Sequence, residues 1–437
     1  MITKIHPQPT LFKLQMNCRF RLALLLFATV FVLASQYCSA AESDPDADGW
    51  YSAKKNQRVT LTLVSLTSNR QGDYYLTADG VRFPHDEKNL LAIASVQPDA
   101  TKKIDQVVAT RAVGTWQPPS GKQHTWKTII TVVRLGSPNE QRETTVTWDN
   151  HKSDFTASVS FSPDEQVSLV FRVDVERFKD PSPNDRRGDA DHDGLLDWEE
   201  ADYARHGVGL GDPGRRDLIL VAAHTHDTWR MTEQTKTLLK TRFLTRGIHL
   251  YIASNDAESL GLCRPGLVKL KGRTIARDYP LSLKEARRIR KKYLKSPMAD
   301  NAHLVILSAL VSPKPSSSWG YADLPGSTLV VRSHLPMLGP DFHQYQAKTL
   351  MHELGHNLGL YHPEQSNARC LSGPIPVSER SAATTVMGTP RADRGNPLAA
   401  LANAWSRPLD YSPTQWKNAR LDWVRPENRP KRRSVKK

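Results

Sequence analysis

Cysteine is scarce in this sequence, with only 4 among 437 residues. Small domains held together by disulfides contain several times more cysteine, so that class of protein is excluded. The N-terminal apolar run Leu22–Ala34 is also shorter than the ~20 residues that a membrane-spanning helix needs. The chain does contain 39% hydrophobic residues and 10 tryptophans, too many for a disordered protein. Its length allows two or three domains.

The first 41 residues have the composition of a secretory signal peptide. Basic residues without any acidic residue precede the apolar run, and the small residues Ser39–Ala41 follow it. We therefore expect residues 1–41 to be cleaved near Ala40 or Ala41, and the protein to be secreted or periplasmic. The alternative is an uncleaved N-terminal anchor, in which case the chain would contact a membrane through this segment only.

The formal net charge of +15 comes from three short segments. The signal segment contributes +4, the stretch Lys284–Lys295 contributes +6 and the tail Pro426–Lys437 contributes +5, so the remainder is balanced. A basic surface along the whole chain is excluded, and no nucleic-acid partner is expected. We expect the tail to be disordered. For Lys284–Lys295, a solvated helix face is favoured over binding of an acidic substrate or an anionic lipid.

From Gln57 to Phe178 the hydrophobic pattern has the two-residue period of half-buried strands. Runs such as Val167–Val175 are separated by turn clusters such as Pro118–Gly121. Seven or eight short strands at this spacing predict an antiparallel β-sandwich. We assign residues 42–179 to this domain and expect an accessory or binding role, because it contains no recognisable catalytic constellation.

The proline-rich segment Asp180–Asp189 predicts a domain boundary, and we place a junction at residues 180–215. Residues 216–425 form the predicted second domain, of the α/β (α+β) class, and residues 426–437 are the basic tail. In the second domain, buried strands alternate with amphipathic helices. The expected strands are Leu218–Ala223, Gly247–Ala253, His303–Leu310 and Thr328–Arg332. The expected helices are Thr232–Phe243 and Ser282–Lys295, with Ser282 as the N-cap of the second.

Residues His352–His362 read HELGHNLGLYH. His352 and His356 are four residues apart, so on a helix they project from one face and can bind one metal ion. Gly359 can adopt the positive φ that ends a helix, and the turn brings back His362 as a third ligand. Three nitrogen ligands leave one tetrahedral position of zinc open, as in catalytic sites. The alternative, three unrelated histidines on an ordinary helix, requires a chance match on the order of 10⁻⁴.

Glu353 lies next to the first of these histidines in the sequence. A glutamate there can hydrogen-bond a zinc-bound water and act as its general base. These residues therefore predict metal-assisted hydrolysis.

The pattern HExxHxxGxxH followed by a methionine turn is the mark of the metzincin zinc peptidases, and the chain resembles that clan from Asp217 to about Trp423. The resemblance implies that Thr384–Gly388 is the Met-turn and that Met387 forms an apolar floor beneath the zinc. It also implies that Gly320–Arg332 borders the substrate cleft, as an edge to which a peptide adds as a strand.

Several metzincins have a tyrosine two residues after this methionine, where the present chain has Thr389. The residue that stabilises the oxyanion is therefore unassigned. Tyr411 is one candidate for that role, and a structural role is the favoured alternative.

Together, the residues and the resemblance predict an exported zinc metalloendopeptidase, a hydrolase that cleaves a protein or peptide substrate. In this interpretation Glu353 activates the zinc-bound water. The alternative is a calcium-dependent adhesin or binding protein with a degenerate metalloprotease domain. The intact set of three histidines and one glutamate argues against that alternative.

Residues Asp189–Glu200 read DADHDGLLDWEE and match the calcium-loop pattern D-x-D-x-D-G-x5-E. The predicted ligands are oxygens of Asp189, Asp191, Asp193, Leu195, Asp197 and Glu200, with Leu195 acting through its carbonyl. The loop resembles the single acidic repeats of thrombospondin type 3 and dockerin modules and the EF-hand loop. We expect a structural calcium ion that stiffens the domain junction; a solvated acidic turn is the alternative.

Two weaker patterns remain open. Cys263 and Cys370 are the cysteines left after signal removal, and they either pair in an oxidising compartment or stay as thiols. His224 and His226 have a spacing that allows a second metal site, but a polar loop is the favoured interpretation.

Overall fold

The computed structural model describes the main part of the chain from residue 57 to residue 425. The described residues are 57–86, 88–113, 125–151, 153–177, 188–197, 199–200, 203, 212, 214–253, 266–270, 273–275, 279–295, 298–308, 310–311, 320–332, 342–364, 369–370, 373–381, 385–388 and 407–425. Several predictions concern residues outside these ranges and remain predictions. They are the signal segment, the boundary near residue 180, Cys263, Thr389 and the basic tail. Within the described residues, no helix is both long and apolar enough to cross a membrane.

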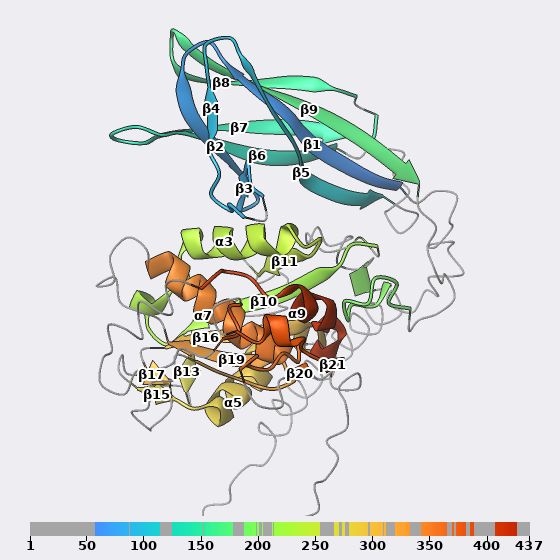
Figure 1. Ribbon diagram of the computed structural model, residues 1–437, viewed down its shortest axis with the longest axis vertical. Helices are drawn as coiled ribbons and strands as arrows, with labels where there is room; N and C mark the ends of the chain where they lie inside the picture. Colours follow the sequence, from blue (N-terminus) through green and yellow to red (C-terminus); the bar gives the residue numbers. More distant parts are fainter. Residues whose placement is uncertain are drawn as a thin grey trace, which may run out of the picture.

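The N-terminal region contains two antiparallel sheets that pack face to face (Figure 1). One sheet has the order β5-β1-β9-β8, from Thr101–Val113, Gln57–Ser68, Glu165–Arg177 and Phe155–Ser162. The other has the order β3-β2-β6-β7, from Val81–Phe83, Gly72–Ala78, Thr125–Arg134 and Glu140–Asp149, with β4 (Ala94–Val96) paired to β2. Alternate residues of both sheets fill the core, including Leu61 of β1 and Trp148 of β7.

The second region contains a mixed six-stranded sheet. Five strands share a direction: β11 (His249–Ile252), β10 (Asp217–His224), β16 (Ala302–Ser308), β19 (Thr328–Arg332) and, beside the end of β10, β12 (Gly266–Leu267). The sixth strand, β18 (Gly320–Ala322), runs antiparallel to β19 and is the last strand on that side of the described sheet. Strand β10 is almost wholly buried, as expected for a parallel strand covered on both faces.

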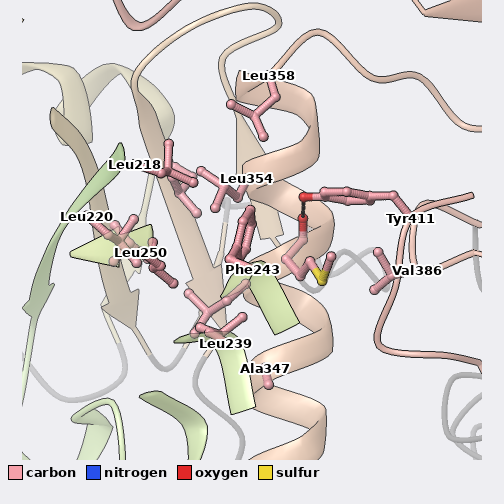
Figure 2. Packing of buried hydrophobic residues seen from close by; sticks show 14 of the residues in the cluster. Leu218, Leu220, Leu239, Phe243, Leu250, Ala347, Leu354, Leu358, Val386 and Tyr411 are labelled. Atoms are coloured by element: carbon pink, nitrogen blue, oxygen red, sulfur yellow. Dashed lines mark hydrogen bonds between the residues drawn. The ribbon is translucent and has the colours of Figure 1, made fainter. Parts of the chain in front are cut away.

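Helices cover both faces of this sheet. Leu218 and Leu220 of β10 pack with α3 (Glu233–Leu244) and α7 (Phe342–Asn357) on one face (Figure 2). Residues of the opposite parity in β10 pack with α5 (Leu283–Tyr293) on the other face. Ser282 forms a reciprocal capping box with Glu285 at the start of α5, which confirms the predicted cap.

Short elements complete the described chain. They are η1 (Asp227–Trp229), β13 (Lys269–Leu270), β14 (Arg273–Thr274), β15 (Pro280–Leu281), α6 (Met298–Asn301), β17 (Leu310–Val311), β20 (Arg369–Cys370), β21 (Gly373–Pro374), η3 (Val377–Glu379), α9 (Pro413–Asn418) and η4 (Leu421–Val424).

The predicted fold class, an antiparallel β-sandwich followed by an α/β domain, is confirmed. The expected strand His303–Leu310 is wrong in one respect. Strand β16 ends at Ser308, and Leu310 belongs to β17, which pairs with β15 in a separate two-stranded sheet. Apolar character alone does not show where a buried chain leaves one sheet and joins another.

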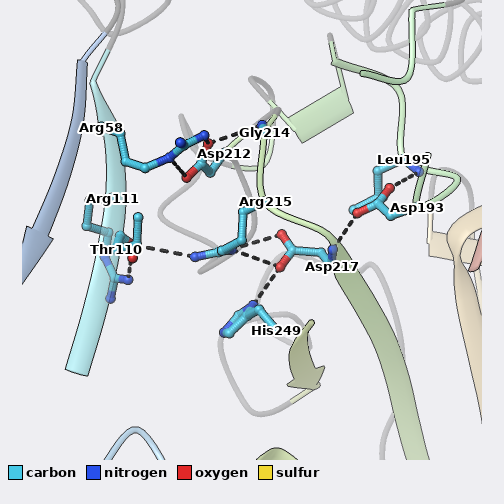
Figure 3. A network of polar contacts seen from close by, with 10 residues as sticks. All are labelled: Arg58, Thr110, Arg111, Asp193, Leu195, Asp212, Gly214, Arg215, Asp217 and His249. Carbon is cyan, nitrogen blue, oxygen red and sulfur yellow. Dashed lines mark hydrogen bonds and ion pairs between the residues drawn. The ribbon is translucent and has the colours of Figure 1, made fainter. Parts of the chain in front are cut away.

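The two regions are joined by polar contacts. The guanidinium of Arg58 in β1 donates to both carboxylate oxygens of Asp212, at 2.8 and 2.9 Å (Figure 3). Helix α3 meets the sandwich where Lys240 Nζ donates to the carbonyl oxygen of Asp79 at 2.6 Å. These contacts bring α3, which also packs against α7, next to β3.

Candidate active site

Helix α7 carries the first half of the HELGHNLGLYH segment. Its apolar side packs against the sheet through Ala347, Leu350, Met351 and Leu354, and Leu358 continues this contact just after the helix (Figure 2). The two histidines of the helix lie off this apolar side and are partly exposed. Burial of one side of the helix therefore leaves the other side free to form a site.

The three predicted histidines meet in space. Gly359 has φ of 86°, and the turn at this residue reverses the chain after α7. One ring nitrogen from each of His352, His356 and His362 lies within 4.8 Å of the others, and the Nε2 atoms of His356 and His362 are 2.9 Å apart. A single metal ion fits this donor set.

Backbone carbonyls orient two of the rings. His352 Nδ1 donates to the carbonyl oxygen of Val386, and His356 Nδ1 donates to that of Leu360, both at 2.8 Å. In a neutral imidazole this leaves Nε2 as the bare nitrogen, the arrangement of histidines that ligate metals. Burial lowers the pKa of His356 to about 4 and that of His352 well below its ordinary value. The rings are therefore neutral at pH 7, as metal binding requires.

The side chain of Glu353 lies in a more buried environment than that of its neighbour His352. It is only 5% exposed and its carboxylate lies against Gly320 in the edge strand β18. Burial raises the pKa of this carboxyl to about 8. A cation at the histidines would favour the carboxylate and bring that pKa down. The contact with Gly320 was not foreseen from the sequence.

The predicted Met-turn lies against the same helix. Met387 is fully buried, and the absence of a side chain at Gly355 makes room for its sulfur one residue before His356. Val386 N donates to the carbonyl oxygen of Asp410 at 2.7 Å, which ties the turn to the chain that precedes α9. Arg407, which no sequence pattern indicated, donates to the carbonyl oxygen of Gly388.

Tyr411 has a structural environment. It is 2% exposed, and its hydroxyl donates to the carbonyl oxygen of Met351 in α7 at 2.5 Å (Figure 2). A hydroxyl committed to a backbone carbonyl inside the core favours the structural role over oxyanion stabilisation.

The acidic loop gathers its carboxylates around the expected turn. Gly194 has φ of 94°, and its N–H and that of Asp193 donate to the two carboxylate oxygens of Asp189, at 3.1 Å each. Oxygens of Asp189, Asp191 and Asp193 lie within 4.8 Å of one another. Oxygens of Asp193, Glu200 and Asp217 meet the same limit, although Asp217 lies outside the motif.

The electrostatics of this cluster are unfavourable without a cation. Burial, followed by neighbouring aspartates, raises the pKa of Asp191 to about 8 and that of Glu200 well above its ordinary value. Glu200 is fully buried, and within the described residues neither of its carboxylate oxygens has a hydrogen-bond partner. The acidic cluster could therefore bind a metal ion.

The weaker histidine pair behaves as a polar loop. His224 Nε2 lies 3.3 Å from Asp227 Oδ1, and His226 caps η1 by accepting from Thr228 N at 3.2 Å. Among the described residues, the groups that could hold a metal ion are the histidine triad and the two overlapping acidic groups.

The described fold and site define a protein with an antiparallel β region followed by a mixed α/β domain that carries a metal-type histidine triad. A comparison with solved structures matches archaemetzincin from Methanopyrus kandleri, at 17% identity over 48% of this chain and 97% of that chain, with a TM-score of 0.29. Human GIVD cytosolic phospholipase A2 matches at 10% identity over 28% of this chain and 17% of that chain, with a TM-score of 0.16.

A C2 domain matches at 8% identity over 27% of this chain and 97% of that chain, with a TM-score of 0.14. Scores this low do not bear on function. Comparison of the sequence with protein-family models gives no match, and comparison with the sequences of curated proteins gives none either.

Proposed function

We propose that this protein is an exported zinc-dependent endopeptidase. The observation that carries the proposal is the convergence of His352, His356 and His362, two of them oriented by backbone carbonyls, beside the buried carboxylate of Glu353. Export rests on the composition of residues 1–41.

The donor set suits zinc, because three neutral imidazoles leave one tetrahedral position open. A zinc ion held there would supply Lewis acidity, which acidifies water and polarises a scissile carbonyl. Glu353 is the residue that would take the proton from the attacking water and pass it to the leaving amine. Its burial against Gly320 holds the carboxylate in place, so little reorganisation is needed during the reaction.

The position of β18 at the edge of the described sheet favours a peptide as the substrate. In the described part of the chain, β18 pairs with β19 on one side and with no strand on the other. An extended peptide can add there as a further strand, which would place its backbone beside Glu353. The site therefore favours cleavage within extended polypeptides.

The alternative, a calcium-dependent adhesin with a degenerate peptidase domain, predicts a site that has lost its catalytic geometry. The oriented histidines and the buried Glu353 argue for a working enzyme. A binding protein has no use for a carboxylate held in this position.

For the acidic loop we propose a structural calcium ion. Several carboxylate oxygens around a tight turn are the hard ligands that calcium prefers, and zinc prefers the nitrogen donors of the other site. Calcium would therefore bind to the acidic loop and zinc to the histidine triad, because each prefers the ligands of its own site.

Casein digestion with and without 1,10-phenanthroline, beside Glu353→Gln, tests the peptidase. We expect Glu353→Gln to retain one zinc per chain and to lose at least about 100-fold in kcat/KM. Glu233→Gln, the same substitution at a glutamate that is 83% exposed on α3, is the control and should keep full activity. Activity of Glu353→Gln within tenfold of the wild type would overturn the assignment.

A further inference from the structure

We propose that the calcium ion in the Asp189–Glu200 loop anchors the C-terminal segment Arg420–Arg425 against the end of helix α7. This contact would stabilise the arrangement of the histidine triad. This inference rests on the two cation sites proposed above. It assigns to calcium a role inside the peptidase domain, in addition to the expected stiffening of the domain junction.

Glu200 is the observation that makes the acidic cluster a cation site. Its carboxylate is fully buried, lacks a hydrogen-bond partner within the described residues, and approaches the oxygens of Asp193 and Asp217 to within 4.8 Å. Asp191 also has a buried oxygen without a partner among the described residues. Buried carboxylates this close together must either take up protons or be neutralised by a cation, and a bound cation lets them stay ionised.

The loop is built into the core of the peptidase domain. Asp193 Oδ2 accepts from Asp217 N at 2.6 Å, at the first residue of strand β10 (Figure 3). Leu195 is buried in the same cluster as Ile219 and Val221 of that strand. A cation that fixes Asp193 therefore fixes the start of a central strand.

The loop also touches the C-terminal segment. Arg425 donates from Nε to the carbonyl oxygen of Gly194, and from Nη2 to the carboxylate of Glu199. A Cβ atom at Gly194 would lie 2.8 Å from the Cα of Asp422, so the backbones of the loop and of η4 are in close contact. The loop and η4 therefore form one packed unit, although more than 200 residues separate them in the sequence.

The C-terminal segment in turn contacts the chain that joins two of the zinc ligands. Arg420 N donates to the carbonyl oxygen of Leu358 at 3.2 Å, between His356 and His362 in the sequence. In the preceding helix α9, Gln415 Oε1 accepts from Thr385 Oγ1 of the Met-turn at 2.5 Å. Loss of the cation would thus loosen the support of both the third ligand and the methionine floor.

Asp217, which contributes an oxygen to the acidic cluster, also connects to the sandwich through Arg215. Asp217 holds Arg215 through two hydrogen bonds of 2.9 and 3.0 Å, and Arg215 Nη1 donates to the carbonyl oxygen of Thr110 in β5 at 3.5 Å (Figure 3). The cation site therefore lies where β10, the C-terminal segment and the sandwich meet.

The test is hydrogen–deuterium exchange of the zinc-loaded full chain, with calcium titrated into calcium-free buffer and binding followed by calorimetry. We expect one calcium ion to bind. At a calcium concentration about 100 times the Kd, amide exchange should slow about 100-fold in residues 188–200, 217–224, 385–388 and 420–425. The reason is that a ligand specific for the closed state raises the ratio of closed to open molecules by a factor of about [L]/Kd.

Two variants separate binding from anchoring. Glu200→Gln should bind calcium at least about tenfold more weakly. Arg425→Gln keeps every loop carboxylate, so it should still bind calcium, but calcium should no longer protect residues 385–388. Glu233→Gln, at the exposed position on α3, should behave as the wild type.

Calcium binding with protection confined to residues 188–200 would overturn the anchoring role. Failure of the wild type to bind calcium would overturn both this inference and the calcium proposal. Neither outcome bears on the zinc peptidase, which is judged by the Glu353→Gln digestion assay.

Discussion

Gly320 and Glu353 are in direct contact across the boundary between strand β18 and helix α7. A Cβ atom at Gly320 would lie 2.5 Å from Cγ of Glu353 and 2.6 Å from its Oε1, which is closer than real side chains approach. The glycine therefore makes room for the carboxylate beside the histidine triad. It couples the edge strand, where a peptide would bind, to the residue proposed as the general base.

We expect Gly320→Ala to displace the Glu353 carboxylate and to lower kcat/KM about 100-fold, since a shift of about 1 Å at a reacting group has an effect of that size. Zinc content should be unchanged, because the substitution touches none of the three histidines. Steady-state peptide hydrolysis and elemental analysis measure the two quantities.

Gly136→Ala is the control for that experiment. Gly136 lies in a turn of the sandwich, and its added Cβ would approach only the carbonyl oxygen of Pro138, at 3.3 Å. Full activity in Gly320→Ala would show that the contact with Glu353 has no role in catalysis.

Tyr411→Phe should destabilise the protein while leaving catalysis intact. Removal of the hydroxyl leaves the buried carbonyl of Met351 without this donor, at a cost of about 1–3 kcal/mol in the free energy of unfolding. The value of kcat, measured well below the melting temperature, should change by less than about threefold. A 100-fold fall in kcat with unchanged stability would instead identify Tyr411 as the missing oxyanion stabiliser.

Zinc should be retained at a lower pH than exposed histidines would allow. Burial lowers the pKa of all three ligands, that of His356 to about 4 from an ordinary value of 6.5. As the pH falls below 6.5, the three rings thus take up protons less readily than exposed imidazoles, and His356 stays neutral and able to bind metal until about pH 4. Over the same range the metal-free protein should lose stability, because the unfolded chain takes up those protons more readily.

Dialysis at a series of pH values from 7 to 4, followed by measurement of zinc per chain, tests this expectation. We expect zinc to be retained well below pH 6.5, the ordinary pKa of an exposed histidine. Half-release near pH 6.5 would show that the protein does not lower the pKa of these three ligands.

Asp212→Asn should weaken the connection between the sandwich and the peptidase domain. The side chain of Asp212 is 1% exposed and that of Arg58 is 23% exposed. We therefore expect the free energy of unfolding to fall by about 2–3 kcal/mol, somewhat less than for a fully buried pair. A double-mutant cycle with Arg58→Gln in urea unfolding should show a coupling of about 1 kcal/mol or more. The exposed pair Arg172–Asp174 is the control and should show less than about 1 kcal/mol.

Local patterns predicted much of this molecule. The alternation in Val167–Val175 indicated strand β9, and Ser282 indicated the start of α5, because strand alternation and helix capping depend on residues close in sequence. The i, i+4 spacing of His352 and His356, with the turn at Gly359, indicated the triad for the same reason.

Long-range contacts were not predictable in this way. Asp217 joins the acidic cluster from outside the motif, and Arg425 reaches the loop from the far end of the chain. Gly320 lies against Glu353 because α7 packs across both β18 and β19, an arrangement that no pattern in either segment specifies.

The sequence by itself determined the residues available for chemistry: three histidines and a glutamate on one helix and its turn, and a loop of carboxylates. Spacing along a helix or a tight loop sets their geometry, so neighbours in the chain are neighbours in space. Only the tertiary structure decided what surrounds these groups. Three features come from the packing of distant segments into shared cores: the burial of Glu353 against Gly320, the bond of Tyr411 to α7, and the contact of Arg425 with the acidic loop. Such packing depends on residues throughout the chain and not on any local pattern.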